Sequence, residues 1–272
     1  MKNFHVVEKT GKMPGKTVLI LAGVHGNEVC GIKAFDKLLP SLELNAGKAI
    51  FIYANLEAIK QNKRFVECNL NRCFLKKQPE DVVNTLEGRT AVQIMEILDK
   101  ADVLLDIHAS NSVDSVPFVI GEKNSFEFAR VMPFEIISFN WDEFEKGATD
   151  AYMNNNGKMG FCIECGYVKD PKGQERAEIA IMNFLRKANL IKGKAKKTKG
   201  QKYFRISSLY KNKYGSFNKW RDFADFEYLK EKTLIGHDGN KEVFAEKDNN
   251  IIFVRDRKDL NQECFVIAKE NK

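Results

Sequence analysis

The chain of 272 residues contains no long hydrophobic run. Its longest apolar stretch, Val18–Val24, has seven residues even when Gly23 is counted, whereas a helix that spans a bilayer needs about 20. The first nine residues (MKNFHVVEK) already include an acidic residue and lack the apolar core of a secretory signal. We therefore expect a cytoplasmic protein that has no membrane partner.

Cysteine is also scarce, with six residues in the whole chain. Because no secretory signal is visible, free thiols are expected rather than disulfides. Cys162 and Cys165 form a C-x-x-C pair, and Cys68 and Cys73 form a looser pair, so a structural zinc site is an alternative. The segment around Cys162, however, has the composition of a strand, in which residues three apart point to opposite faces. We therefore favour free cysteines.

The composition does supply material for a sizeable core, because 43% of the residues are hydrophobic and 30% are charged. It excludes a disordered chain and a disulfide-stabilised miniprotein, and it favours one large domain or one domain plus a small one. The net charge of +7 arises from 44 basic and 37 acidic residues. Six of the basic residues are lysines in the acid-free segment 192–202, so the remainder is nearly neutral. We therefore expect no nucleic-acid partner.

Strands alternate with helices through the first 191 residues. Short apolar runs, of the kind buried on both faces of a parallel sheet, predict strands at Val18–Val24, Ala49–Ala54, Ala101–His108, Glu135–Phe139 and Lys158–Cys165. Helical spacing of apolar residues predicts helices at Val29–Leu39, Asn84–Lys100 and Gln174–Asn189. This alternation indicates the α/β class, with a mainly parallel, mixed central sheet flanked by helices.

The composition changes at residue 192. The segment Lys192–Lys202 combines six lysines with two glycines, which predicts a linker. Short aromatic and β-branched runs follow it at Tyr203–Tyr210, Glu242–Ala245, Ile251–Arg255 and Glu263–Lys269. We therefore predict a catalytic domain of residues 1–191 and a small C-terminal all-β domain of residues 203–272, joined by a linker at 192–202.

Metal-ligating side chains follow two of the predicted buried strands. His25 and Glu28 lie three residues apart in the turn where a strand becomes a helix, and Gly23 and Gly26 allow that turn to be tight. His108 closes another buried strand. The carboxyl ends of parallel strands meet at one edge of the sheet, where open α/β sheets build their sites. Two histidines and one carboxylate, with a fourth position left for water, match the ligand set of a catalytic zinc ion.

Two further carboxylates stand in positions that suit this chemistry. Glu164 lies near the end of an apolar run, so it would be partly desolvated, as is suitable for a general base that activates water and protonates the leaving nitrogen. Asp106 precedes His108 by two residues and faces the same side of its strand, so it can orient that histidine. A buried structural carboxylate is the alternative for Asp106.

The polar stretch 63–72 supplies Arg64, Asn71 and Arg72 in a loop-like context. Arginine and asparagine side chains can clamp a substrate carboxylate and stabilise an oxyanion. Taken alone, the pattern is weak, because arginine and asparagine are common on surfaces.

Four motifs carry a resemblance when taken in order: HGNE at 25–28, NLNR at 69–72, DIH at 106–108 and IECG at 163–166. In this order and spacing they resemble the aspartoacylase/succinylglutamate desuccinylase family of zinc carboxypeptidase-like hydrolases. The resemblance spans most of the chain, since that family also ends in a small β domain. It implies one zinc ion per chain held by His25, Glu28 and His108, with Glu164 as general base and acid.

The resemblance also implies roles for the polar stretch: Arg64 would stabilise the scissile carbonyl oxygen, while Asn71 and Arg72 would hold the substrate's carboxylate. The chain departs from the family after His108, where Ala109 follows, and after Glu164, where a cysteine follows. The zinc chemistry survives both changes, but the acyl group and amino acid that are accepted do not follow from the sequence.

We therefore expect a zinc-dependent amidohydrolase that cleaves the amide bond of a small N-acylated, carboxylate-bearing amino acid. A metallocarboxypeptidase or peptide amidase with the same zinc site is the nearest alternative, and a non-catalytic binding protein is a more distant one. The sequence leaves open whether the chain forms a homo-oligomer.

Overall fold

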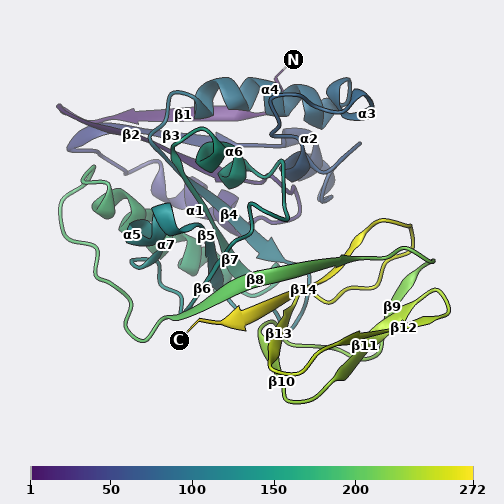
Figure 1. The fold of residues 1–272 in the computed structure, drawn as a ribbon. Helices are drawn as coiled ribbons and strands as arrows, with labels where there is room; N and C mark the ends of the chain where they lie inside the picture. The colour runs from purple at the N-terminus through teal and green to yellow at the C-terminus, as the bar shows by residue number, and fades with distance from the viewer. Residues whose placement is uncertain (1, 272) are drawn as a thin grey trace.

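In a computed structural model, which describes residues 2–271, eleven strands form one continuous sheet in the order β1-β3-β2-β4-β7-β5-β6-β8-β14-β13-β10. These strands are β1 (His5–Thr10), β2 (Met13–Ala22), β3 (Ala46–Tyr53), β4 (Val103–Ser110), β5 (Phe118–Gly121), β6 (Ile136–Phe139), β7 (Met159–Tyr167), β8 (Lys202–Lys211), β10 (Glu227–Leu229), β13 (Asn249–Ile252) and β14 (Glu263–Glu270). A second sheet contains β9 (Phe217–Lys219), β11 (Thr233–Asp238) and β12 (Lys241–Ala245). Figure 1 shows the smaller sheet at the lower right of the view, away from the marked C-terminus.

Helices cover both faces of the first half of the large sheet (Figure 1). They are α1 (Cys30–Leu38), α2 (Leu56–Gln61), α3 (Glu80–Val83), α4 (Leu86–Leu98), α5 (Phe126–Ala129), α6 (Thr149–Asn155) and α7 (Gly173–Lys187), with short 3-10 turns at Leu70–Arg72 and Lys123–Ser125. Helices α1, α5 and α7 pack on one face, and α4 and α6 pack on the other.

The predicted α/β class with a mixed, mainly parallel central sheet is confirmed. Strands β3, β2, β4 and β7 run parallel to one another. Strand β1 joins one edge in the antiparallel direction, and β5 inserts antiparallel beside β7. Strands β1 and β5 were not predicted. The strands and helices that were predicted in this half are all present, with their ends shifted by a few residues.

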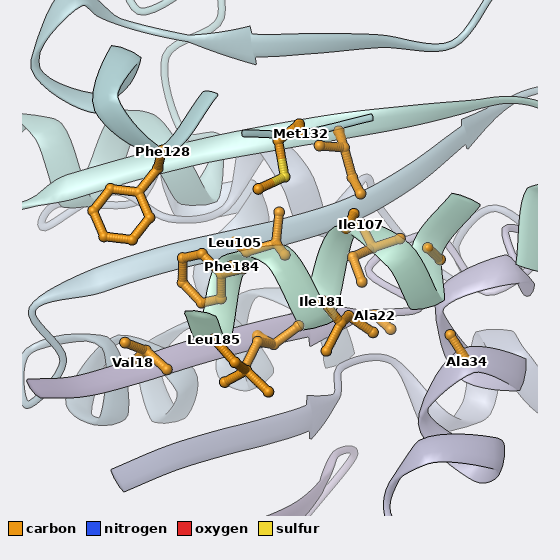
Figure 2. Packing of buried hydrophobic residues seen from close by; sticks show 14 of the residues in the cluster. Val18, Ala22, Ala34, Leu105, Ile107, Phe128, Met132, Ile181, Phe184 and Leu185 are labelled. Carbon is orange, nitrogen blue, oxygen red and sulfur yellow. The ribbon is translucent and has the colours of Figure 1, made fainter. Parts of the chain in front are cut away.

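The core explains why these strands have continuous apolar sequences. Along β2, Val18 and Ile20 point into the cluster beneath α1 and α7, while Leu19 and Leu21 point into the cluster beneath α4. Successive side chains of a strand face opposite sides, so a strand covered by helices on both faces must be apolar at every position. Figure 2 shows the first of these clusters, in which Phe184 lies against the sheet.

The strand β8 connects the two halves, because it pairs parallel with β6 and antiparallel with β14. The lysine-rich segment before it has no helix or strand before Lys202, and Thr198 ties it to the backbone of Arg130 and Met132. The division into domains at 192–202 stays a prediction. No helix in the described range of 2–271 has the length and apolar character to cross a membrane.

The six cysteines are free thiols, as predicted. Cys162 and Cys165 lie in different core clusters on β7, as expected for strand residues three apart. They therefore do not form a four-cysteine zinc site with Cys68 and Cys73.

Candidate active site

The turn after β2 brings His25 and Glu28 to the carboxyl edge of the sheet. Gly23 there has φ +71°, which a residue with a side chain rarely adopts. At Gly26 an added Cβ would lie 2.1 Å from the backbone of Ala58, so only glycine fits against α2. The backbone amide of Glu28 donates to the carbonyl of His25 at 3.1 Å, which closes the turn. The glycines therefore place both side chains over the end of β4.

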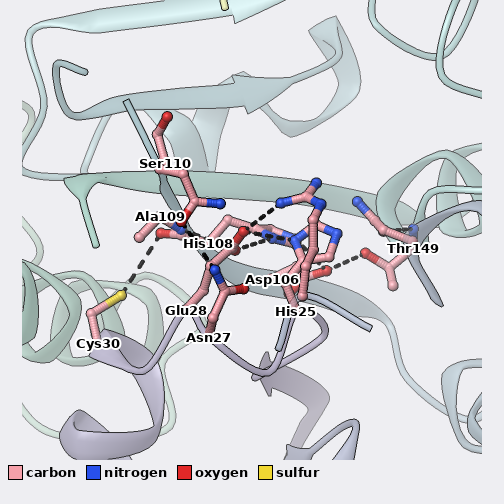
Figure 3. A network of polar contacts seen from close by, with 12 residues as sticks. His25, Asn27, Glu28, Cys30, Asp106, His108, Ala109, Ser110 and Thr149 are labelled. Atoms are coloured by element: carbon pink, nitrogen blue, oxygen red, sulfur yellow. Dashed lines mark hydrogen bonds and ion pairs between the residues drawn. The ribbon is translucent and has the colours of Figure 1, made fainter. Parts of the chain in front are cut away.

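Glu28 lies between the two histidines (Figure 3). One carboxylate oxygen is 2.8 Å from His25 Nδ1, and the other is 2.9 Å from His108 Nδ1. All three side chains are buried, and one donor atom from each lies within 4.8 Å of the others. His25 Nδ1 is enclosed without a hydrogen-bond partner, despite its closeness to Glu28. Two imidazole nitrogens and a carboxylate that converge in this way fit a metal ion.

Burial and the neighbouring charged groups together set the pKa values of these side chains. Burial, reinforced by Arg64, lowers the pKa of His25 to about 4, so its imidazole is neutral and able to ligate. Burial alone would raise the pKa of Glu28, but the neighbouring imidazoles hold that pKa well below its usual range. The pKa of His108 lies well above its usual value because Asp106 outweighs the effect of burial.

Each histidine is supported on its far side by a polar group. The predicted contact between Asp106 and His108 is present, with Asp106 Oδ2 3.0 Å from His108 Nε2. Asp106 is itself held by the Thr149 hydroxyl, which donates to Oδ2 at 2.5 Å. His25 Nε2 lies 3.0 Å from Asn69 Oδ1. Oxygen acceptors at these positions leave both Nδ1 atoms facing Glu28. The role of Asn69 was not predicted.

Asp106, His108 and Cys162 form a second group of potential ligands. It would use Nε2 of His108, the nitrogen that faces Asp106. Burial holds the pKa of the Cys162 thiol well above its usual value, so the thiolate that a metal requires is disfavoured. The first group therefore fits a catalytic metal better.

Glu164 stands on β7 directly beside His108 of β4, in the register that pairs the two strands. Its Oε2 atom is enclosed without a hydrogen-bond partner. Burial, with Glu28 as the next cause, raises the pKa of Glu164 to about 8. A metal ion at the neighbouring ligands would add positive charge and lower this pKa again. The side chain therefore has the location and the tunable ionisation of a general base.

The predicted substrate-binding residues line the same cleft as the histidines and Glu164. Arg64 donates to Glu28 at 2.9 Å and remains about one-third exposed. The Asn71 side chain accepts from the Thr149 amide at 3.2 Å. Arg72 is held by two carboxylates, because its Nη2 is 2.9 Å from both Glu145 and Glu263. The structure thus brings the three residues together but shows Arg72 with acidic partners.

The family model named succinylglutamate desuccinylase/aspartoacylase catalytic domain matches residues 14–189, which is more than half of the chain. The chain belongs to this family. The predicted resemblance is thereby confirmed, and every predicted site residue lies within the matched range.

Two relatives named as members of this family are distant from the chain in sequence. A Nostoc protein named "Probable aspartoacylase" is 26% identical over 166 residues, which cover 56% of this chain and 55% of that protein. A succinylglutamate desuccinylase from Pseudomonas syringae pv. tomato is 24% identical over 88% of this chain and 78% of its own length. The match to the Nostoc protein thus spans about half of that relative.

The fold extends further than the sequence similarity. The crystal structure of a succinylglutamate desuccinylase from Vibrio cholerae aligns with a TM-score of 0.81, at 18% identity, over 97% of this chain and 85% of the other. This alignment includes the C-terminal strands, which the family model does not cover.

Strand β14 and the segment before it contribute cleft residues that the sequence did not predict in this family member. Arg255, Arg257 and Glu263 line the cleft together with the zinc-ligand candidates. Arg255 and Arg257 lie two residues apart, a spacing that places them on one side of an extended segment. The spacing alone could not show that this side faces a cleft on the other half of the molecule.

Proposed function

We propose that the protein is a zinc-dependent hydrolase that cleaves the amide bond of an N-acylated, carboxylate-bearing amino acid. The observation that carries the proposal is the convergence of His25, Glu28 and His108 beside Glu164 in one cleft. Membership of the succinylglutamate desuccinylase/aspartoacylase family supports the same substrate class. The names of the relatives refer to N-succinyl and N-acyl amino acids, and here that specificity is proposed only as a class.

His25, Glu28 and His108 would hold one zinc ion through nitrogen and carboxylate donors. Bound zinc supplies a water of lowered pKa and polarises the amide carbonyl. Asn69 accepts from His25 Nε2, and the Asp106 carboxylate lies 3.0 Å from His108 Nε2, so each histidine ring has an oxygen on its far side that keeps it oriented.

Glu164 acts on protons at two points of the proposed reaction. Its carboxylate takes a proton from the attacking water and later delivers it to the leaving nitrogen of the amide. The enclosed position of Oε2 keeps bulk water from competing for that proton. Arg64 lies beside Glu28 and presents its guanidinium to the carbonyl oxygen, on which negative charge develops.

Asn71 and Arg72 are proposed to hold a substrate carboxylate at the neighbouring wall of the cleft. Because Arg72 is paired with Glu145 and Glu263, the substrate would have to replace one of these carboxylates. Arginine can accept a planar carboxylate through two parallel hydrogen bonds, which makes such an exchange feasible.

A substrate panel tests the proposal. N-acetyl and N-succinyl derivatives of aspartate and glutamate should be hydrolysed by the zinc-loaded protein, and a chelator should abolish the activity. Peptides with free C-termini serve as the comparison. Cleavage of the peptides alone would indicate a carboxypeptidase, and no hydrolysis of either set by zinc-loaded protein would refute the proposal.

A further inference from the structure

Two arginines from the segment between β13 and β14 line the cleft without an acidic side chain paired to them. Arg255 and Arg257 both line it, and neither forms an ion pair with any side chain in the described part of the chain. Arg72 and Arg64, in contrast, are each paired with at least one carboxylate. Positive charge in an enclosed site is costly unless an anion compensates it.

An unusual backbone conformation turns this segment toward the cleft. Phe253, directly after β13, has φ +57°, a value that is strained for a residue with a bulky side chain. Its amide donates to Asp225 Oδ1 at 2.9 Å, and its ring packs 5.7 Å from that of Phe118. Such strain persists where surrounding contacts hold it and often occurs at binding sites.

Beyond this turn the chain is extended and fixed at two points. The amide of Arg255 donates to the carbonyl of Cys264 at 2.9 Å. Arg257 forms an antiparallel bridge with Phe217. Residues two apart in an extended chain face the same side, so both guanidinium groups are directed to the cleft that they line.

The guanidinium of Arg255 is positioned but not satisfied. Its Nη2 lies 3.3 Å from Ser110 Oγ, on the strand that carries His108. Its Cζ atom lies 4.9 Å from the centre of the Phe253 ring, a cation–π contact that holds the group in place. Its Nε is enclosed and has no hydrogen-bond partner. A donor held in this way is available to an acceptor that the protein does not supply.

The positive charges of the cleft arginines repel one another. Burial lowers the pKa of Arg255, and the next cause is repulsion from Arg64. Burial also lowers the pKa of Arg257, with Arg255 as the next cause. Glu164 and Asp225 act on Arg255 in the opposite direction, but at longer range than an ion pair. The cleft therefore has an excess of positive charge on this side, next to the proposed base.

We propose that Arg255, assisted by Arg257, forms an anion subsite that holds a second carboxylate of the substrate, distinct from the carboxylate assigned to Asn71 and Arg72. The inference rests on the proposed function and deepens it, because it makes the connection between β13 and β14 part of the substrate site. The carboxylate is supplied either by the side chain of the amino acid or by the acyl group. Arg255 is thereby a specificity-determining residue.

Three substrates that share an α-carboxylate separate the two sources: N-succinyl-L-glutamate, N-butyryl-L-glutamate and N-succinyl-L-norvaline. The butyryl compound lacks the acyl carboxylate, and the norvaline compound lacks the side-chain carboxylate. In the wild-type protein, one of these two losses should lower kcat/KM by about 10- to 100-fold, mainly through KM. In Arg255→Gln the same loss should cost less than about threefold, because the two changes remove one interaction.

Control variants separate charge recognition from folding. Arg255→Lys keeps the cation and should recover part of the discrimination. Lys258→Gln removes a positive charge from an exposed position of the same segment and should leave all three substrates unaffected. If Arg255→Gln does not fold, the wild-type comparison still decides, since a loss below about threefold for both truncated substrates overturns the subsite.

Two results in folded Arg255→Gln would also overturn the proposal. One is an equal decrease of kcat/KM for all three substrates, and the other is a decrease of kcat with KM unchanged, as for a group that stabilises the oxyanion. Calorimetric binding of the same compounds keeps the test separate from the proposed function. If the wild-type protein hydrolyses none of them, the proposed function fails, whereas carboxylate binding that depends on Arg255 still supports the subsite.

Discussion

Glu28 links most of the candidate active site through a single carboxylate. Its oxygens contact both histidine rings, the Arg64 guanidinium and the backbone amide of Ala109. Each of these groups carries or can carry positive charge or a donor hydrogen, so the buried carboxylate is compensated on all sides. The ligand geometry therefore depends on neighbours whose own positions are fixed by Asn69 and Asp106.

Glu164→Gln tests the proposed base. The amide keeps the size of the side chain but cannot accept a proton, so turnover should fall by about 100- to 10,000-fold. Zinc content, measured by elemental analysis, should stay at one ion per chain, because Glu164 is not among the proposed ligands. The matched control is Glu96→Gln on the exposed side of α4, which should retain wild-type turnover. Near wild-type kcat in Glu164→Gln would exclude the assigned role.

Asp106→Asn tests a residue that orients the proposed ligand His108 and that does not bind the metal itself. Loss of the carboxylate that faces His108 Nε2 should weaken zinc binding by about 10- to 100-fold. The zinc dissociation constant, measured by competition with a chelator of known affinity, gives the result. Asp102→Asn, in the exposed turn before β4, is the control and should bind zinc as the wild type does. Unchanged affinity in Asp106→Asn would show that His108 does not need this partner.

The local sequence pattern determined which strands and turns could be predicted. The strands β2 and β4 are apolar at consecutive positions because helices cover both their faces, and the turn after β2 carries its own glycines. These features lie within a few residues of sequence, so the positions of His25, Glu28 and His108 at one sheet edge followed from the pattern. The antiparallel β5 has only four residues and is defined by its pairing with β7, which no local pattern reveals.

The contacts that the sequence could not predict join residues that are far apart in the chain. Arg72 is 191 positions from Glu263, its partner across the cleft, and the sequence offers no spacing rule that relates them. The same holds for Arg255, whose nearest polar partner, Ser110, lies on a strand of the other half of the molecule. Residue types and motif order thus indicated the candidate metal ligands and the candidate base, whereas the charge balance within the cleft required the structure.

Gly26→Ala tests the close packing of the turn against α2. An added Cβ would overlap backbone atoms of Ala58, which cannot move aside as a flexible side chain can, so His25 or α2 must shift. We expect a loss of about 1–3 kcal/mol in the free energy of unfolding and weaker zinc binding. Chemical denaturation and zinc titration measure the two effects. Gly173→Ala at the start of α7 is the control, because its Cβ would meet Cys30 only at 3.4 Å. Equal behaviour of the two variants would contradict this account.

For the whole molecule, the distribution of charge matters more than its sum. The net charge of +7 includes six lysines in the segment 192–202, away from the chemistry. Within the cleft, Arg64, Arg255 and Arg257 repel one another, while Asp142, Glu145 and Asp150 gather around α6 and the loop before it, where Arg72 pairs with Glu145. A buried acidic group with acidic neighbours favours its protonated form.

Asp150 shows this effect most directly. Burial raises its pKa to about 7, with Asp142 as the next cause. Asp142 itself has a pKa raised to about 6, first by burial and then by Glu122. An unfolded chain ionises its aspartates near pH 4. Between pH 4 and 7 these two aspartates therefore bind fewer protons in the unfolded state than in the folded state, and their contribution to the free energy of unfolding falls as the pH rises through this window.

Asp150→Asn should remove most of that slope, because an amide neither ionises nor repels Asp142. The stability of the variant relative to the wild type should increase by about 1–3 kcal/mol between pH 4 and 7, and should change little above pH 8. Urea denaturation of metal-free protein at several pH values measures this difference. The contributions of other titrating groups cancel in the difference, because both proteins contain those groups. The exposed Asp81→Asn is the control and should show no such trend. A stability difference independent of pH would mean that Asp150 is ionised in the folded protein, with Arg72 as its compensating charge.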